Sequence, residues 1–145
     1  MRIHEVLAHK PSHDVVTVRP DATVRELLGM LAEYNIGALV VSTDGAAVDG
    51  IVSERDIVRR LHADESVLDA AVSTIMSSQV QTCEKDATVN ELMSIMTERR
   101  FRHVPVIEGG VLRGVVSIGD VVKHRIDELE AERSSLEGYI TGERI

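Results

Sequence analysis

The chain has 145 residues, of which 43% are hydrophobic, 28% charged and only 2% aromatic, and its formal net charge is −8. This length is enough for one domain or for two small repeats that share a core. The acidic charge argues against nucleic acid as a partner and against binding to an anionic membrane, and no apolar run approaches the roughly 18 residues of a membrane span.

The first half of the chain predicts a β-α-β-β-α unit. A short strand is expected near Val15 to Val18, and the capping box Thr23 to Glu26 then opens an amphipathic helix. Two strands follow, Ile36 to Val41 and about Val48 to Ser53, and a second helix starts at the end of the latter. The stretch from Leu61 to Met76 connects to the second half and is expected to be partly helical.

The second half predicts the same order of elements. A short strand at Val80 to Cys83 precedes a helix with apolar positions from Val89 to Met96. Two strands follow, Phe101 to Ile107 and Val111 to Ser117. They flank Gly109-Gly110, a dipeptide that is typical of a two-residue hairpin turn.

Internal repetition accounts for this likeness. The segment Asp21 to Leu27 returns as Asp86 to Leu92, at an offset of 65 residues (86 − 21). The offset becomes 64 at Gly50 and Gly114 (114 − 50), so one residue is missing from the intervening loop. We therefore expect the two halves to share one fold and to cover each other's apolar helix faces.

Each half also contains the same junction between a strand and a helix, Gly50 to Asp56 and Gly114 to Asp120. Both copies read Gly, two apolar residues, Ser, two variable residues and Asp. A buried strand that ends at Ser and enters a helix directly places free helix-start N–H groups beside a hydroxyl and a carboxylate. Such a junction suits a ligand that carries hydroxyl or anionic groups.

The same Ser-x-x-Asp pattern is also close to a capping box, in which the two side chains satisfy each other's backbone N–H groups. Thr23 to Glu26 and Thr88 to Glu91 are better capping boxes, and they open the other helix of each half. Because the side chain of Asp is shorter than that of Glu, Asp56 and Asp120 are expected to reach their own N-caps less well. A carboxylate at this place could instead accept hydrogen bonds from a ribose diol, and both interpretations stay open.

On these motifs the chain resembles a stand-alone tandem pair of cystathionine-β-synthase (CBS) domains, often called a Bateman module. The resemblance rests on Asp-Ala-Thr-Val at Asp21 and Asp86, on His-Val-Pro-Val at His103, and on the two junctions. It implies an α/β (α+β) fold in which two pseudo-twofold-related β-α-β-β-α repeats form one compact module, followed by a C-terminal helix. The expected boundaries are 1–64 for the first repeat, 65–126 for the second with 65–76 as connector, and 127–145 for the C-terminal helical extension.

The resemblance further implies a regulatory, non-enzymatic module that binds an adenosine-containing ligand in two clefts between the repeats. AMP is the first expectation, and ATP, ADP or NAD(H) are the alternatives. The residues expected to hold ribose hydroxyls are Ser53, Asp56, Ser117 and Asp120. Aliphatic rather than aromatic groups are expected around the adenine, because the chain has no Trp. The adenine frame carried over by position consists of Thr17, Val18, Arg19, Ala38, Thr82, Cys83, Val104 and Pro105.

Phosphate recognition is predicted in the second half. Arg102 and His103 lie at the entry of the strand that lines the cleft in this family, and an Arg side chain is well suited to phosphate. The corresponding first-half residues are Gly37 and Ala38, so the two clefts are expected to differ, and we expect Arg102 to share its cleft with Asp56. The candidate phosphate-binding residues are Arg102, His103 and, more weakly, Arg55.

Catalysis and metal binding find little support in the sequence. Cys83 has no cysteine partner, and the histidines at His4, His9, His13, His62 and His124 lack metal-ligand spacing. A nucleophile elbow and a Walker loop are also missing, so neither an enzyme nor a catalytic cofactor is expected. The single cysteine and the short, charged N-terminus predict a cytoplasmic protein.

Two hypotheses of different classes remain. The first is a nucleotide sensor in signal transduction that acts on a separate, unknown partner protein. The second is a ligand-independent dimeric scaffold that retains the CBS fold.

The C-terminal residues predict a homodimer in either case. Between about Val121 and Tyr139 a charged helix is expected, with a heptad-like apolar stripe that Arg133 interrupts. The stripe consists of Val122, Ile126, Leu129, Leu136 and Ile140. Because it is too short for an independent coiled coil, we expect it to pack on a second copy of the chain.

Overall fold

The computed structural model of the chain describes residues 1–10 and 15–141, and its architecture is mixed α and β. Each half of the sequence forms one three-stranded sheet with its own helices, and the two sheets have the same strand order. The predicted fold class of two like β-α-β-β-α units is therefore confirmed.

The first sheet consists of β1 (Thr17–Val18), β2 (Ala38–Val41) and β3 (Gly50–Ser53), in that order. β1 runs parallel to β2, and β2 runs antiparallel to β3. α2 (Val24–Tyr34) connects the parallel pair, and α3 (Glu54–Ala63) begins directly after β3. The strand-to-helix junction predicted at Ser53 is therefore present.

The second sheet repeats this arrangement with β4 (Cys83–Glu84), β5 (His103–Glu108) and β6 (Val111–Ser117). α4 (Val89–Arg99) connects the parallel pair, and α5 (Ile118–Thr141) begins directly after β6. The equivalent junction at Ser117 is thus also present.

The predicted hairpin turn is confirmed, and two predicted strands are shorter than expected. Gly109 and Gly110 have φ angles of 58° and 80°, which a two-residue turn of this kind requires. β1 and β4 contain only two residues each, because pairing with the neighbouring strand is limited to Thr17–Val18 and Cys83–Glu84.

The segment before each half packs into the core of the other half. α1 (Ile3–Ala8) lies against the second half, where Ile3 and Val6 join a core with Leu92 and Val116. The backbone N–H of Ile3 donates to the carbonyl of Ala87 over 2.9 Å.

The connector does the same for the first half. It forms two short 3-10 helices, η1 (Glu65–Asp69) and η2 (Val72–Thr74), and Val72 is fully buried in the first-half core. The N–H of Val72 donates to the carbonyl of Ala22 over 2.8 Å. The two halves are therefore interlocked, and each core contains residues from both sides of the sequence boundary at 64/65.

The repeated glycines allow these crossing segments to lie close to the sheets. A Cβ atom at Gly50 would stand 2.7 Å from the sulfur of Met76 and 2.8 Å from the carbonyl oxygen of Ser77. A Cβ atom at Gly114 would stand 2.9 Å from Cδ2 of Leu7. Glycine thus begins the motif in each half because another segment passes directly over the strand.

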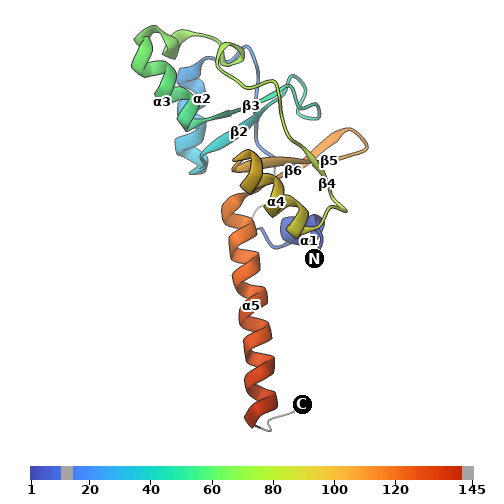
Figure 1. Cartoon of the computed structure of the whole chain (residues 1–145). Helices are drawn as coiled ribbons and strands as arrows, with labels where there is room; N and C mark the ends of the chain where they lie inside the picture. Colours follow the sequence, from blue (N-terminus) through green and yellow to red (C-terminus); the bar gives the residue numbers. More distant parts are fainter. Residues whose placement is uncertain (11–14, 142–145) are drawn as a thin grey trace.

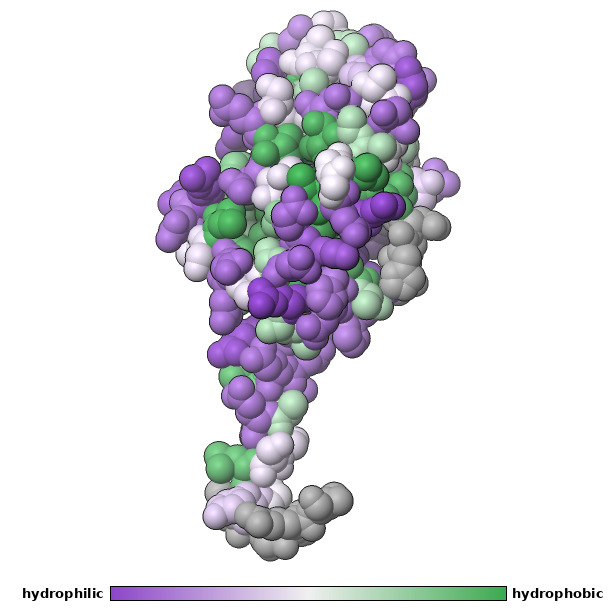
Figure 2. All heavy atoms as spheres, turned by 90° about the vertical axis from the view of Figure 1, so that its right-hand side faces the viewer, coloured by the Kyte–Doolittle hydropathy of each residue, from purple (hydrophilic) through white to green (hydrophobic). Residues whose placement is uncertain are grey.

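The second helix of the second half and the C-terminal extension are one continuous helix. α5 contains 24 residues, which corresponds to about 36 Å, and Figure 1 shows it leaving the two-sheet body at its lower end. Figure 2 shows apolar side chains across the middle of the body, whereas the extended part of α5 is mostly hydrophilic on this face. Among the described residues, no helix has both the length and the apolar character needed to cross a membrane.

Candidate functional site

A cleft with a volume of about 940 Å³ lies between the two halves. Its walls come from α1 and the residues after it, from the end of α2, from β2 and β6, and from the start of α5. Polar and charged side chains therefore meet here from segments that are far apart in the sequence. Those that line the cleft are His4, Lys10, Tyr34, Asn35, His103, Arg113, Ser117 and Asp120.

The start of α5 supplies the hydroxyl and the carboxylate of this cleft. The backbone N–H of Ser117 donates to Oδ2 of Asp120 over 2.9 Å, and the N–H of Asp120 donates to Oγ of Ser117 over 3.1 Å. The N–H of Ile118 donates to the carbonyl of Arg102 over 2.8 Å. Because these helix-start donors are already used, the Asp120 carboxylate and the Ser117 hydroxyl are the groups that a ligand would meet.

Lys10 pairs with this carboxylate from the other end of the chain. Its ammonium lies 3.0 Å from Oδ2 of Asp120 and donates to the carbonyl of Val115 over 2.8 Å. The Lys10 and Asp120 side chains are only 31% and 24% exposed, so this ion pair is partly shielded from water. Burial alone would raise the pKa of Asp120, but hydrogen bonds from the backbone of Ser117 and from Lys10 outweigh it and hold that pKa below its ordinary value.

His103 lies in the same cleft, where β5 begins. It is opposite Ser117 in the β5–β6 ladder, and its ring faces Gly37 of the first half, where a Cβ atom would stand 3.9 Å from Cε1 of the imidazole. Burial lowers the pKa of His103, although the nearby carboxylates of Asp120 and Glu54 oppose this shift. The imidazole is therefore held in its neutral form near pH 7.

The equivalent junction at α3 has the same internal geometry but a different setting. The N–H of Ser53 donates to Oδ2 of Asp56 over 2.8 Å, and the Ser53 hydroxyl donates to the same atom over 3.0 Å. Neither residue lines the cleft described above. The residue equivalent to Lys10 at the 65-residue offset is Ile75, which is 5% exposed and part of the first-half core.

Both Ser-Asp junctions are thus complete capping boxes, which corrects one prediction from the sequence. The N-cap N–H to carboxylate distances are 2.8 Å at Asp56 and 2.9 Å at Asp120, against 3.0 Å at Glu26 and 3.2 Å at Glu91. The shorter side chain of Asp reaches its N-cap as well as Glu does. A ribose-binding role would therefore be added to a capping role rather than replace it.

The expectation that Arg102 shares a cleft with Asp56 stays a prediction, since neither residue lines this cleft. Arg102 and His103 lie beside Ser117 and Asp120, because β5 pairs with β6 and the Arg102 carbonyl accepts from the first N–H of α5. Of the two, only His103 is among the cleft-lining residues, and Arg102 is exposed. Asp56 is not among the residues that line this cleft.

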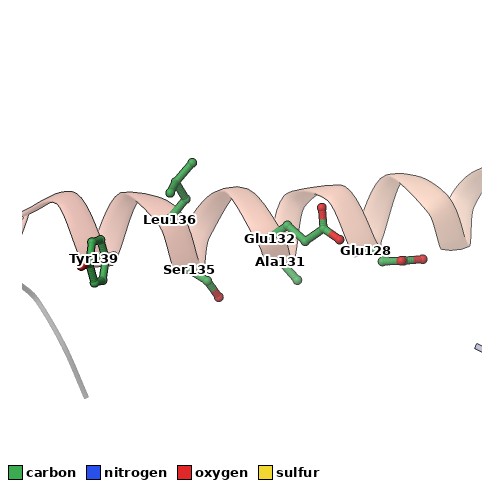
Figure 3. Close-up of a pocket in the computed structure, with 6 residues that line it drawn as sticks. All are labelled: Glu128, Ala131, Glu132, Ser135, Leu136 and Tyr139. Carbon is green, nitrogen blue, oxygen red and sulfur yellow. The ribbon is translucent and has the colours of Figure 1, made fainter.

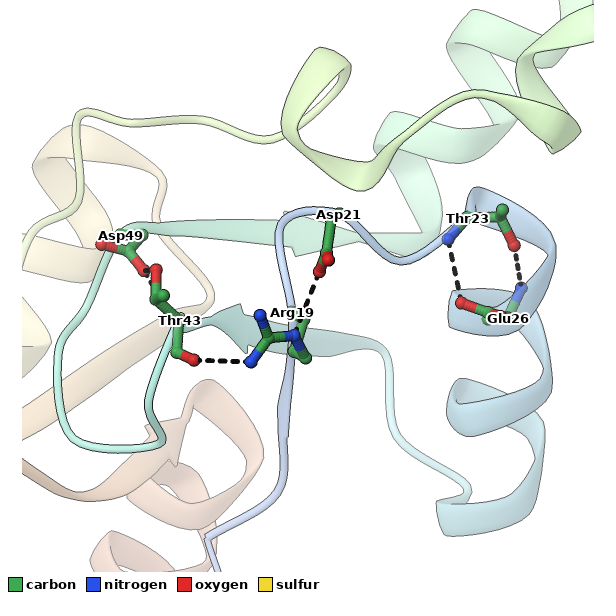
Figure 4. A network of polar contacts seen from close by, with 6 residues as sticks. All are labelled: Arg19, Asp21, Thr23, Glu26, Thr43 and Asp49. Carbon is green, nitrogen blue, oxygen red and sulfur yellow. Dashed lines mark hydrogen bonds and ion pairs between the residues drawn. The ribbon is translucent and has the colours of Figure 1, made fainter.

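Most of the expected adenine frame lies outside the cleft. Ala38 lines it, but Val18, Val104 and Pro105 are buried inside the two halves. The guanidinium of Arg19 is bound to Asp21 and to the carbonyl of Thr43 (Figure 4), and Arg19 is not among the residues that line the cleft. The other expected residues that do not line this cleft are Thr17, Thr82, Cys83 and Arg55.

The cleft contains residues that the sequence interpretation missed. Lys10 and Arg113 bring positive charge, Val15 and Val16 bring aliphatic surface, and Tyr34 is its aromatic side chain. No local pattern marks Lys10, because its carboxylate partner is more than 100 residues away. The repeat does offer a signal for Val15, which has its counterpart in Val80.

Two other features of the described chain are less suited to a small ligand. A shallow hollow along α5 is bounded by that helix alone, between Glu128 and Tyr139, with Leu136 pointing away from Ser135 and Ala131 (Figure 3). Burial, together with the charge of Glu84, raises the pKa of Cys83 to about 11, so its thiol is a poor nucleophile. No cluster of metal-ligating side chains occurs among the residues that the structure describes.

Comparison with known families matches the CBS domain twice, to residues 3–63 and 72–127. A 17.7 kDa protein of Acidianus ambivalens is 36% identical over 114 residues, which are 78% of this chain and 68% of that protein. The CBS domain-containing protein CBSX3, mitochondrial, of Arabidopsis thaliana is 36% identical over 127 residues, and the match covers 84% of this chain and 62% of the plant protein. The chain thus spans about two thirds of the length of these relatives.

Solved structures give the same result. A CBS-domain containing protein from Agrobacterium tumefaciens is 44% identical with a TM-score of 0.81, and the match covers 86% of this chain and 99% of that one. The CBS domain pair of protein MJ0100, solved with 5′-methylthioadenosine and S-adenosyl-L-methionine, has a TM-score of 0.75 at 21% identity. That match covers 85% of this chain and 98% of the other, and at this identity it shows a shared fold.

Proposed function

The chain belongs to the CBS domain family, and from this premise we propose that it is a regulatory module that binds an adenosine-containing nucleotide between its two repeats. Ligand binding would change the shape or the affinity that the module presents to a separate partner protein. AMP is the first candidate, and ATP, ADP and NAD(H) are alternatives.

The observation that carries this proposal is the cleft of about 940 Å³ at the start of α5. Its size is within the range of small-molecule sites. The carboxylate of Asp120 and the hydroxyl of Ser117 could bind the ribose diol, and the aliphatic side chains of Val15, Val16 and Ile36 could frame the adenine. Both ligands in the MJ0100 structure contain adenosine, which supports the same ligand class here.

A thermal-shift panel tests this function. The compounds are AMP, ADP, ATP, NAD, NADH and S-adenosylmethionine, each at millimolar concentration. A ligand that binds only the folded state stabilises it by RT ln(1 + [L]/Kd), which is about 2.7 kcal/mol at a hundredfold excess over Kd and clearly raises Tm. If no compound moves the transition, the sensor function is excluded.

One observation favours the second candidate, a scaffold that no longer depends on a ligand. The two side chains of each Ser-Asp pair form a complete capping box, so the pairs also have a role in helix stability that needs no ligand. The same thermal-shift panel separates the two functions, because a scaffold would show one unchanged Tm with every nucleotide.

We propose that the protein acts as a homodimer in either function. α5 carries a stripe of large apolar side chains that are exposed to solvent. The stripe repeats at heptad-like intervals, which suits pairing with a second copy. The exposed members are Val122, Ile126, Leu129 and Leu136.

A further inference from the structure

We propose that Lys10 makes the Asp120 cleft selective for nucleotides that carry an anionic group, and that Lys10 moves from Asp120 to this group when the ligand binds. The inference rests on the proposed function and adds the charge of the ligand and the residue that reads it. Arg102, the phosphate-binding candidate from the sequence, is not required.

Two groups of the protein already contact the Asp120 carboxylate. Its carboxylate accepts from the N–H of Ser117 over 2.9 Å and lies 3.0 Å from the ammonium of Lys10. A ribose diol that binds Asp120 must share the carboxylate with Lys10 or displace it. Displacement alone would leave a partly shielded ammonium without its counter-ion, which is costly.

The charge of the ligand decides whether the ammonium of Lys10 finds a new partner. A neutral nucleoside brings no replacement for the lost carboxylate, whereas a nucleoside phosphate brings an anion on the same ribose. The flexible four-carbon side chain of Lys10 can turn from one to the other while its stem stays in place. Binding of a phosphate thus becomes an exchange of partners, in which Lys10 pairs with the phosphate and the Asp120 carboxylate accepts hydrogen bonds from the ribose hydroxyls.

The cleft around Asp120 contains further charged groups. Arg113 adds a second positive charge to the lining, and its only described ion pair is a long one of 3.7 Å to Glu108. The acidic groups near this place are Asp120 itself and Glu54, which faces His103. The lining itself therefore holds two cationic side chains and one carboxylate, on a chain whose formal net charge is −8.

The other Ser-Asp junction provides an internal control. Its carboxylate, Asp56, accepts from the Ser53 N–H and hydroxyl, and the position equivalent to Lys10 holds the buried Ile75. If a nucleoside binds there, it meets no equivalent lysine. Selectivity for anions should therefore be confined to the Asp120 cleft.

Calorimetric titration of AMP and adenosine into the full chain tests this, with Asp56→Ala as the parent so that only the Asp120 cleft is measured. Lys10→Met keeps most of the side-chain volume and removes the charge. We expect this variant to bind AMP about tenfold to a hundredfold more weakly than the parent does. Its affinity for adenosine should be unchanged or higher. Lys10→Arg should restore much of the preference for AMP. Arg102→Ala is the matched control and should leave the ratio of the AMP affinity to the adenosine affinity unchanged.

The outcomes separate this inference from the function on which it rests. If neither compound binds the unmutated chain or the Asp56→Ala parent, the nucleotide function itself fails. If both bind and Lys10→Met weakens them equally, or Arg102→Ala alone removes the preference, the role of Lys10 is refuted while the function stands. A Tm of Lys10→Met close to that of the parent shows that the variant is folded when it is titrated.

Discussion

At the scale of single residues, Asp56 and Asp120 combine a structural and a proposed binding role. Each accepts from the backbone N–H of its own N-cap serine, and only Asp120 also has a lysine partner among the described contacts. The same substitution at the two positions therefore separates helix capping from the Lys10 ion pair.

We expect Asp56→Ala to lower the free energy of unfolding by about 1 kcal/mol, because a capping interaction is lost. Asp120→Ala should cost more, since it also leaves the ammonium of Lys10 without its carboxylate. Urea denaturation of both variants measures the two losses, and Asp127→Ala, an exposed position within α5, is the control. Equal losses at Asp56 and Asp120 would show that the ion pair adds nothing to stability.

His103 predicts a dependence of stability on pH. Because burial lowers its pKa in the folded state, the unfolded chain, with an ordinary pKa of 6.5, binds the proton more readily. The contribution of His103 to the free energy of unfolding is thus fully present above about pH 6.5. It is lost as the pH falls below 6.5 and through the lower pKa that His103 has in the folded state.

Urea midpoints measured from neutral to mildly acidic pH should therefore fall faster for the parent than for His103→Gln. The other titrating groups are common to both proteins and cancel in the comparison. Parallel profiles would mean that His103 is protonated as easily in the folded chain as in the unfolded one.

At the scale of elements, the two glycines that begin the junction motif are predicted to differ in how well they tolerate a methyl group. Gly50→Ala would place Cβ 2.8 Å from the backbone oxygen of Ser77, which is fixed by a 2.9 Å hydrogen bond from the N–H of Ile51. We expect a loss of about 1 to 3 kcal/mol, as is usual for overpacking.

Gly114→Ala meets the end of the Leu7 side chain instead, at 2.9 Å. A side-chain end can rotate, so the loss of stability should be smaller than at Gly50. When Leu7 is already replaced by Ala, adding Gly114→Ala should cost less stability than it does in the parent chain. Thermal or urea unfolding of the two glycine variants gives the comparison. A larger loss at Gly114 would contradict it.

Local sequence signals predicted the elements well but only part of the candidate site. Periodicity, capping boxes and Gly109-Gly110 depend on neighbouring residues, and the structure confirms the helices, strands and hairpin that they predict. The Lys10–Asp120 ion pair and the contact of His103 with Gly37 depend on how the two halves dock. One sequence does not contain that information locally, so Lys10 and Arg113 were not predicted to line the cleft.

At the scale of the whole molecule, α5 is the feature that the two-sheet body does not explain. Its apolar stripe lies on a helix of 24 residues, and Leu136 remains 60% exposed. The proposed homodimer would cover this surface with the same surface of a second copy.

Light scattering should therefore give the mass of a dimer at micromolar concentration. Truncation after Arg125 removes Ile126, Leu129 and Leu136 but keeps Ser117 and Asp120. We expect the truncated chain to dissociate at higher concentration than the full chain while it binds nucleotide with unchanged affinity. A full chain that is monomeric at micromolar concentration would refute the pairing of α5.

The interlocked segments also bear on how such a chain could have arisen. α1 fills the core of the second half, and η2 fills the core of the first. An ancestor with a single repeat would have had one such segment and no second half within its own chain to receive it. Two copies of that ancestor could complete both cores only by exchanging segments, so duplication and fusion of its gene would have turned an obligate pair of chains into one.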